Sequence, residues 1–238
     1  MQKSVPKKLA YTCLEELSKL KAHTKQSDKI WRTLCKEVEI PPIPPAVRCS
    51  KLEYLELWGS LAMGKGDVAN DIKVLNNALF YEHQAIWAYN FAAGKLSKDK
   101  VGQAVLAIAL ANQADHKQHR DTLTAVVRQL GGSPVGPKKD YLETVKPYLA
   151  NGEGNLDSDV NIAKLALALE VDAAIAYGME VAKLKTPALV TAGASIGSVE
   201  ASHATVIRYA FKTLGVDIPV VPAAFVSQAT RSNWILKV

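Results

Sequence analysis

One pattern occurs twice in the chain, and this repeat limits most strongly what the chain can fold into. Residues 82–89 and residues 170–177 both read Glu-x-x-Ala-x-x-Ala-Tyr, 88 positions apart. The Glu, the first Ala and the Tyr stand at i, i+3 and i+7, which share one face of an α-helix. Two histidines repeat as well, because His119 and His203 each precede a Leu-Gly pair by 11 residues. The pattern predicts two similar helical hairpins packed about a pseudo-twofold axis.

Helical periodicity predicts four long helices, over about residues 68–96, 99–130, 157–185 and 188–214. Apolar residues make up 48% of the chain and aromatic residues 7%, a mixture that suits close-packed helices. The first and second helices, and the third and fourth, are joined by a few residues and should form antiparallel hairpins. About 26 residues, Gly131 to Leu156, separate the hairpins, with a short helix expected around Tyr141 to Tyr148. The fold class is therefore all-α, a four-helix bundle with one long crossover.

We expect two parts in the chain. Residues 1–66 form a small helical extension with a Pro-rich linker, and residues 67–238 form the bundle with a C-terminal arm. The extension carries 12 Lys/Arg against 7 Asp/Glu, which is typical of a solvated face more than of a nucleic-acid patch. Its three cysteines match no zinc pattern and favour reduced thiols. With no apolar run of 18 residues and no signal peptide, the sequence predicts a cytoplasmic protein without a membrane span.

Glutamate and histidine residues that could bind a metal lie on one face of each long helix. Glu200-x-x-His203 places a carboxylate and an imidazole together in a helix of small, apolar residues. A carboxylate in a core is costly without a partner, and a metal ion is the best explanation for it. The residues that we expect to converge at mid-bundle as metal ligands are Glu82, His116, His119, Glu170, Glu200 and His203. This mixed oxygen and nitrogen set suits iron or manganese, and zinc tolerates it.

Three phrases of the sequence resemble the ferritin-like superfamily of di-iron carboxylate bundles, and most of all its poorly characterised bacterial ferritin-like domain proteins. They are Ala-Leu-Phe-Tyr-Glu82-His, Leu-Thr-Ala-Val-Val-Arg-Gln-Leu-Gly-Gly132 and Ser-Ile-Gly-Ser-Val-Glu200-Ala-Ser-His203. The resemblance covers about residues 68–226. It implies a di-metal site in the core and ferroxidase-type or other redox chemistry with oxygen or peroxide.

The second helix departs from the family pattern. The family has Glu-x-x-His there, whereas this chain has His116-x-x-His119, so one bridging carboxylate is lost. A second register aligns Gln113-x-x-His116 instead, but the helix ends favour the first. Two divalent ions bring four positive charges and three glutamates only three negative ones. The sequence therefore predicts a centre that holds two ions less tightly, holds only one, or favours a different metal.

Other polar residues near these positions receive secondary roles. Tyr89, Tyr177 and Gln113 are candidates for an outer shell around the ligands, although core packing is the preferred explanation for both tyrosines. His83 should point away from the centre, because one residue corresponds to about 100° around a helix. Asp115, Asp121 and Asp172 are expected to be solvated.

Three functional hypotheses follow. The first is a dinuclear iron or manganese protein, an oxidoreductase if it is an enzyme. The second is a non-catalytic bundle in which the same Glu and His residues pair as a polar network. The third is a hydroxylase of a larger substrate such as tRNA, with the basic extension as a docking arm, although we do not expect nucleic acid as a partner. We also expect a homo-oligomer, a dimer.

Overall fold

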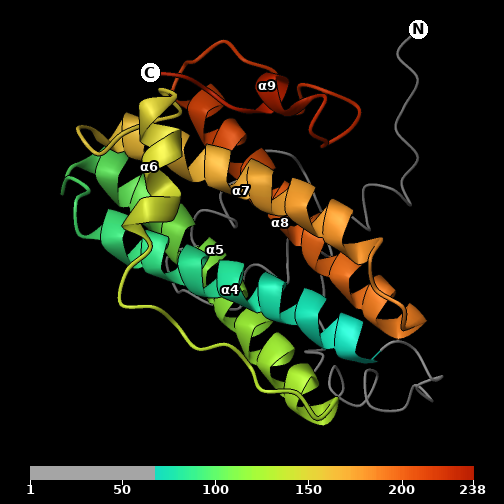
Figure 1. Cartoon of the computed structure of the whole chain (residues 1–238). Helices are drawn as coiled ribbons and strands as arrows, with labels where there is room; N and C mark the ends of the chain where they lie inside the picture. The colour runs from blue at the N-terminus through green and yellow to red at the C-terminus, as the bar shows by residue number, and fades with distance from the viewer. Residues whose placement is uncertain (1–67) are drawn as a thin grey trace, which may run out of the picture. The chain divides into compact units, whose positions relative to one another are not determined.

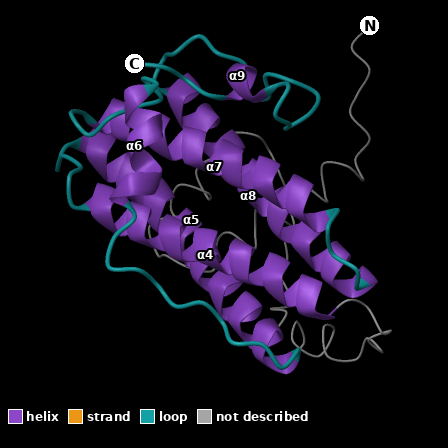
Figure 2. Ribbon diagram, in the orientation of Figure 1, coloured by secondary structure: helices purple, strands orange, loops and turns teal. Residues whose placement is uncertain are grey.

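A computed structural model describes residues 68–238, which form a bundle of four long helices (Figures 1 and 2). The first hairpin consists of α4 (Val68–Ala93) and α5 (Lys100–Gln129), and the second of α7 (Asp159–Val181) and α8 (Pro187–Thr213). Each helix lies within a few residues of its predicted range. No strand occurs among the described residues, so the all-α prediction is confirmed for this part of the chain.

The crossover between the hairpins takes the predicted route. After α5 the chain runs back along the bundle as an extended segment and enters a short helix, α6 (Leu142–Ala150), before α7 begins (Figure 1). The α6 helix matches the one expected around residues 141–148. Because this long connection separates the two hairpins, α7 starts at the same end of the bundle as α5 (Figure 1).

Helices α5 and α8 end in the same way, which explains the two Leu-Gly pairs. The glycine after each helix has a left-handed backbone, with φ of 82° at Gly131 and 88° at Gly215. The Gly131 amide donates to the Arg128 carbonyl, and the next amide donates to the Val127 carbonyl. The Gly215 and Val216 amides repeat this arrangement at the end of α8. Both are Schellman caps, which satisfy the last carbonyls of a helix and favour glycine.

A buried carboxylate joins the two hairpins near the start of α4. Asp71 is fully buried, and it accepts hydrogen bonds from the backbone amides of Lys185 (2.8 Å) and Thr186 (3.0 Å) in the turn between α7 and α8. Asn70 donates to the Lys183 carbonyl in the same turn. The side chain of Asp71 thus fixes where the second hairpin turns against the first.

We expect Asp71→Ala to lower the free energy of unfolding by about 2–4 kcal/mol, because one buried and one partly buried amide lose their acceptor. Burial raises the pKa of Asp71, but the hydrogen bonds from Lys185 and Thr186 outweigh it, and the net pKa is lowered. This stabilisation is therefore complete above the ordinary pKa of about 3.9 and is lost as the pH falls through the lowered pKa. Urea unfolding between pH 7 and pH 2 measures both effects.

The matched control is Asp217→Ala, which removes an exposed carboxylate. It should leave the unfolding free energy within about 0.5 kcal/mol of wild type. Equal stability of Asp71→Ala and wild type at pH 7 would contradict the role given to Asp71.

The C-terminal arm packs on the second hairpin. It contains a short helix, α9 (Arg231–Trp234), and its Trp234 and Ile235 join the apolar core formed by α7 and α8. Buried Arg208 of α8 donates to the carbonyls of Pro219 and Trp234 and so holds both parts of the arm. The core residues of this cluster are Leu167, Ala168, Val171, Ile175, Ala204, Ile207, Phe211, Trp234 and Ile235.

Between residues 68 and 238, no helix combines the length and apolarity that a bilayer span requires. The predictions for the N-terminal extension, its helices, its linker and its cysteines lie outside the described residues. The docking arm of the third hypothesis lies there as well.

Candidate metal centre

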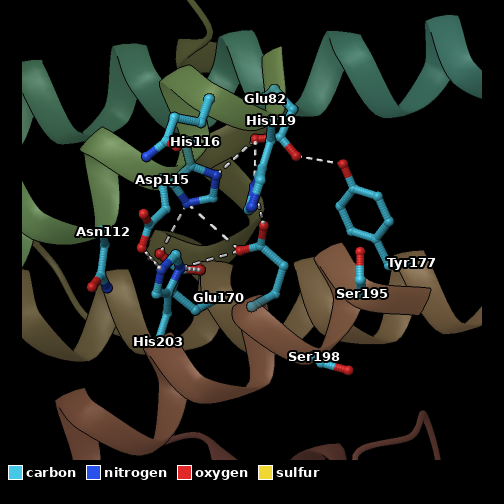
Figure 3. A network of polar contacts seen from close by, with 12 residues as sticks. Glu82, Asn112, Asp115, His116, His119, Glu170, Tyr177, Ser195, Ser198 and His203 are labelled. Carbon is cyan, nitrogen blue, oxygen red and sulfur yellow. Dashed lines mark hydrogen bonds and ion pairs between the residues drawn. The ribbon is translucent and has the colours of Figure 1, made fainter. Parts of the chain in front are cut away.

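The six predicted ligands lie together inside the bundle, and Figure 3 labels all of them except Glu200. Each of the four long helices contributes at least one of them, so the bundle encloses the cluster on all sides. Five of the six residues are at most 3% exposed, and the side chain of His119 is 12% exposed. The residues are Glu82 from α4, His116 and His119 from α5, Glu170 from α7, and Glu200 and His203 from α8.

The cluster divides into two overlapping groups of four residues, each suited to one metal ion. The ligand atoms within each group lie within 4.8 Å of one another. One group contains Glu82 and His119, the other contains Glu170 and His203, and both contain His116 and Glu200. The two hairpins thus supply one half each, as the pseudo-twofold repeat predicts, and the halves meet at the two shared residues.

The spacing of the nitrogen and oxygen atoms fits coordination. His119 Nδ1 lies 3.1 Å from Glu200 Oε1, and His203 Nδ1 lies 3.4 Å from Glu200 Oε2 and 3.3 Å from Glu170 Oε2. Two ligands at about 2.1 Å from a shared ion, at octahedral or tetrahedral angles, are roughly 3.0–3.4 Å apart. The donor atoms are therefore close enough to share an ion with little movement.

Three atoms of the cluster are buried without a hydrogen-bond partner. They are both carboxylate oxygens of Glu200, a residue that is 0% exposed, and Nδ1 of His119. The approach of His119 to Glu200 is short, but it does not have hydrogen-bond geometry. An unpartnered buried polar atom costs roughly 1–3 kcal/mol. Glu200 Oε1 faces His119, whereas Oε2 faces His116 and His203, so the unpartnered atoms lie within the two ligand groups.

The tyrosine of each repeat forms a hydrogen bond with a glutamate of the other hairpin. The Tyr89 hydroxyl on α4 donates to Glu170 Oε1 on α7, while the Tyr177 hydroxyl on α7 donates to Glu82 Oε1 on α4. Both tyrosines are buried, and Asn112 donates to the Tyr89 oxygen at 3.0 Å. Each tyrosine therefore orients one carboxylate of the opposite hairpin, and the repeat is a structural unit for positioning the glutamates.

We expect Tyr177→Phe and Tyr89→Phe each to weaken metal binding about 10–100-fold, because residues that orient a ligand typically have effects of this size. The pseudo-twofold arrangement predicts similar losses for the two variants. Calorimetric titration of the metal-free protein measures them. Tyr209→Phe, at a tyrosine that is 52% exposed, is the control; an equal loss there would show that the effect does not arise at the centre.

Asp115 belongs to the centre, and the expectation that it is solvated is wrong. Its Oδ2 lies 3.2 Å from Nε2 of His203, whose other nitrogen faces Glu170 and Glu200. The side chain of Asp115 is only 23% exposed. A carboxylate on the outer nitrogen of a histidine fixes its tautomer and orientation, as is usual for metal-bound histidines.

In the metal-free state, the electrostatics of the cluster favour ion pairs. Burial raises the pKa of Glu82, but the hydrogen bond from His116 and the charge of nearby His119 outweigh it and lower the pKa to about 2. Burial lowers the pKa of His119, yet contacts with Glu200 and Glu82 raise it to about 9. The pKa values of His116 and His203 are likewise raised by the surrounding carboxylates against the effect of burial.

The structure places the other predicted residues at the edge of the centre or outside it. Gln113 donates to Asn90 and to the Ile86 carbonyl, contacts that join α5 to α4. His83 faces the Val135 carbonyl of the crossover, away from the cluster as expected. The structure thus brings together His116 and His119, the pair of the preferred register.

Asp121 and Asp172 were both expected to be solvated, and they differ. Asp121 pairs with neighbouring Arg120 and its side chain is 43% exposed. Asp172 is not a free surface residue, because it accepts two hydrogen bonds from Arg231 of the arm. The sequence shows no local partner for Asp172, since Arg231 is 59 residues away.

A small cavity of about 40 Å³ between α4 and α7 leads to the centre. Glu82, His116, Glu200 and Tyr177 form its inner wall. Three alanines of the repeat, Ala85, Ala173 and Ala176, line the passage, so the small residues of the repeat leave room for access. A second cavity of similar volume has an apolar lining that includes Tyr89.

Sequence reasoning missed two residues of the site, Asn112 and Asp115. Asn112 stands four positions before His116, so helical spacing alone could have placed it on the same face. Asp115 directly precedes His116, and adjacent helical residues point in different directions. Only the packing of α5 against α8 brings Asp115 to His203.

A four-helix bundle with one long crossover and a buried Glu/His cluster at its centre defines a ferritin-like protein. The model of the ferritin-like domain matches residues 70–213, and the chain belongs to this family. A solved structure of a conserved hypothetical protein, rv2844, from Mycobacterium tuberculosis is similar at 21% identity, with a TM-score of 0.46. The similarity covers 66% of this chain and 97% of that one. Among proteins of curated function, none matches the sequence.

Proposed function

We propose that the protein binds a dinuclear transition-metal centre, of iron or manganese, through Glu82, His116, His119, Glu170, Glu200 and His203. The observation that carries this proposal is the burial of both Glu200 oxygens and His119 Nδ1 without hydrogen-bond partners. Glu200 belongs to both groups of ligands, with Oε1 on the side of His119 and Oε2 on the side of His203. One bound cation would satisfy His119 Nδ1 and Glu200 Oε1, and a second would satisfy Glu200 Oε2.

The surrounding residues support this function by their positions. Tyr89 and Tyr177 orient two of the carboxylates, and Asp115 holds His203 with one nitrogen toward the cluster. The cavity at Tyr177 is wide enough for a molecule about the size of water, such as oxygen or peroxide. When bound, iron or manganese would supply redox chemistry with such a molecule. The protein would fix the geometry and keep bulk water from the centre.

Elemental analysis of the full chain, produced in medium supplemented with iron and manganese, tests the proposal. We expect two transition-metal ions per chain. We compare the metal-free protein, prepared with a chelator, with protein in a free metal concentration of about 100 times the dissociation constant. The melting temperature should be lower without metal by roughly 5–10 °C per ion. Oxygen consumption by the Fe²⁺-loaded protein tests the redox part. Absence of bound metal together with an unchanged melting temperature would reject the centre.

The second candidate is a non-catalytic bundle whose Glu and His residues form a polar network. The observation in its favour is the direct contact of His116 Nδ1 with Glu82 Oε2 at 2.8 Å, supported by the raised pKa of His116. Three imidazolium groups would balance three carboxylates without any metal. This network, however, leaves Glu200 without a hydrogen bond, so it does not explain the most buried member of the cluster.

A further inference from the structure

His116 lies between the two halves of the centre and presents one ring nitrogen to each. Its Nδ1 is 2.8 Å from Glu82 Oε2, in the half supplied by the first hairpin. Its Nε2 is 3.2 Å from Glu170 Oε1, in the half supplied by the second hairpin, and 3.7 Å from Glu200 Oε2. The structure thus puts the His116 ring between the two halves (Figure 3).

The other two histidines differ from His116 in this respect. His119 belongs only to the group with Glu82, and its Nδ1 faces that group. His203 belongs only to the group with Glu170, and Asp115 occupies its second nitrogen. Among residues 68–238, two of these histidines are each placed to serve one ion, and only His116 has both nitrogens directed at carboxylates of the ligand groups.

The charge of the ligand set is one negative charge short of balancing two divalent ions, and such a histidine could supply it. Two divalent ions carry four positive charges, and the three glutamates supply three negative ones. A neutral imidazole has only one nitrogen free to bind a metal, because the other carries a proton. If both nitrogens of His116 bind ions, that proton passes to solvent, and the ring contributes the fourth negative charge. Release of protons on metal binding is general for such ligands.

We propose that His116 is a bridging ligand, with Nδ1 bound to the ion on the Glu82 side and Nε2 bound to the ion on the Glu170 side. It takes the place of the second bridging carboxylate, and Glu200 is the other shared ligand. The inference rests on the proposed dinuclear centre. Under this proposal the His116 ring joins the two ions. The distance between the ions is then longer than the roughly 3.5–4 Å of most two-metal sites.

Titration of the metal-free full chain with Co²⁺, whose visible absorption reports binding, distinguishes a bridging from a terminal His116. Wild type should bind two ions. His119→Gln and His203→Gln should each weaken one ion more than about 10-fold and retain the other. His116→Gln should weaken both ions more than about 10-fold, because it removes a ligand from each. Circular dichroism and the melting temperature of the metal-free variants verify that they fold.

Retention of one ion at wild-type affinity by His116→Gln would overturn the bridge. If that variant does not fold, anomalous scattering from crystals of the Co²⁺-loaded wild type decides. We expect an ion on each nitrogen of His116; two ions with only one of these nitrogens bound would overturn the inference while preserving the dinuclear centre. Failure of the wild type to bind any ion would instead reject the proposed function itself.

Discussion

Glu200→Gln should abolish the binding of both metal ions while leaving the metal-free protein folded. Glu200 is the only carboxylate that belongs to both groups of the cluster, so its loss removes a charged ligand from each ion. An amide of the same shape binds transition metals poorly and adds no negative charge. We expect the purified variant to contain less than about a tenth of the wild-type metal by elemental analysis, since each ion loses a ligand.

The stability of the metal-free variant separates the two candidate functions. The Glu200 oxygens accept no hydrogen bond, so the metal hypothesis predicts a change in unfolding free energy of at most about 1 kcal/mol. Under the network hypothesis, removal of this charge would leave buried imidazolium groups without a partner and cost roughly 3–5 kcal/mol. Glu143→Gln, at a side chain that is 81% exposed, is the control. Wild-type metal content in Glu200→Gln would contradict the proposed centre.

Arg231→Met should lower the free energy of unfolding by about 3 kcal/mol and the melting temperature by roughly 6–12 °C. The guanidinium binds both oxygens of Glu153 (2.9 and 2.6 Å) and both oxygens of Asp172 on α7. Glu153 is 4% exposed. Without Arg231, a nearly buried carboxylate loses its charged partner, and the arm loses its connection to α7.

Two further variants test this account of Arg231. Glu153→Gln combined with Arg231→Met should recover part of the loss, because the uncompensated buried charge is then absent. Lys237→Met removes an exposed charge from the same arm and should change the unfolding free energy by less than about 0.5 kcal/mol. Thermal and urea unfolding of the four proteins provide the comparison. Equal losses for Arg231→Met and Lys237→Met would contradict a specific role for Arg231.

Most of the fold of residues 68–238 was accessible from sequence because its signals are local. The helix ends depend on nearby residues, as at Gly131 and Gly215, where the left-handed backbone favours glycine. The crossover followed from counting residues between helices. Contacts between distant segments had no such signal. Asp71 accepts hydrogen bonds from a turn more than 110 residues away. The residues next to Asp71 in the sequence do not indicate that this turn is its partner.

By itself, the sequence determined four helices, their pairing into two hairpins, and the candidate ligand residues that share a face. Helical periodicity fixes the direction of a side chain relative to its own helix, so residues at i, i+3 and i+7 could be grouped without a structure. Only the tertiary structure decided how the four faces combine. The packing of the hairpins depends on side chains far apart in the chain. It places each of the two tyrosines against a glutamate of the opposite hairpin. It also brings Asp115 to His203 and places His116 between the two halves of the centre.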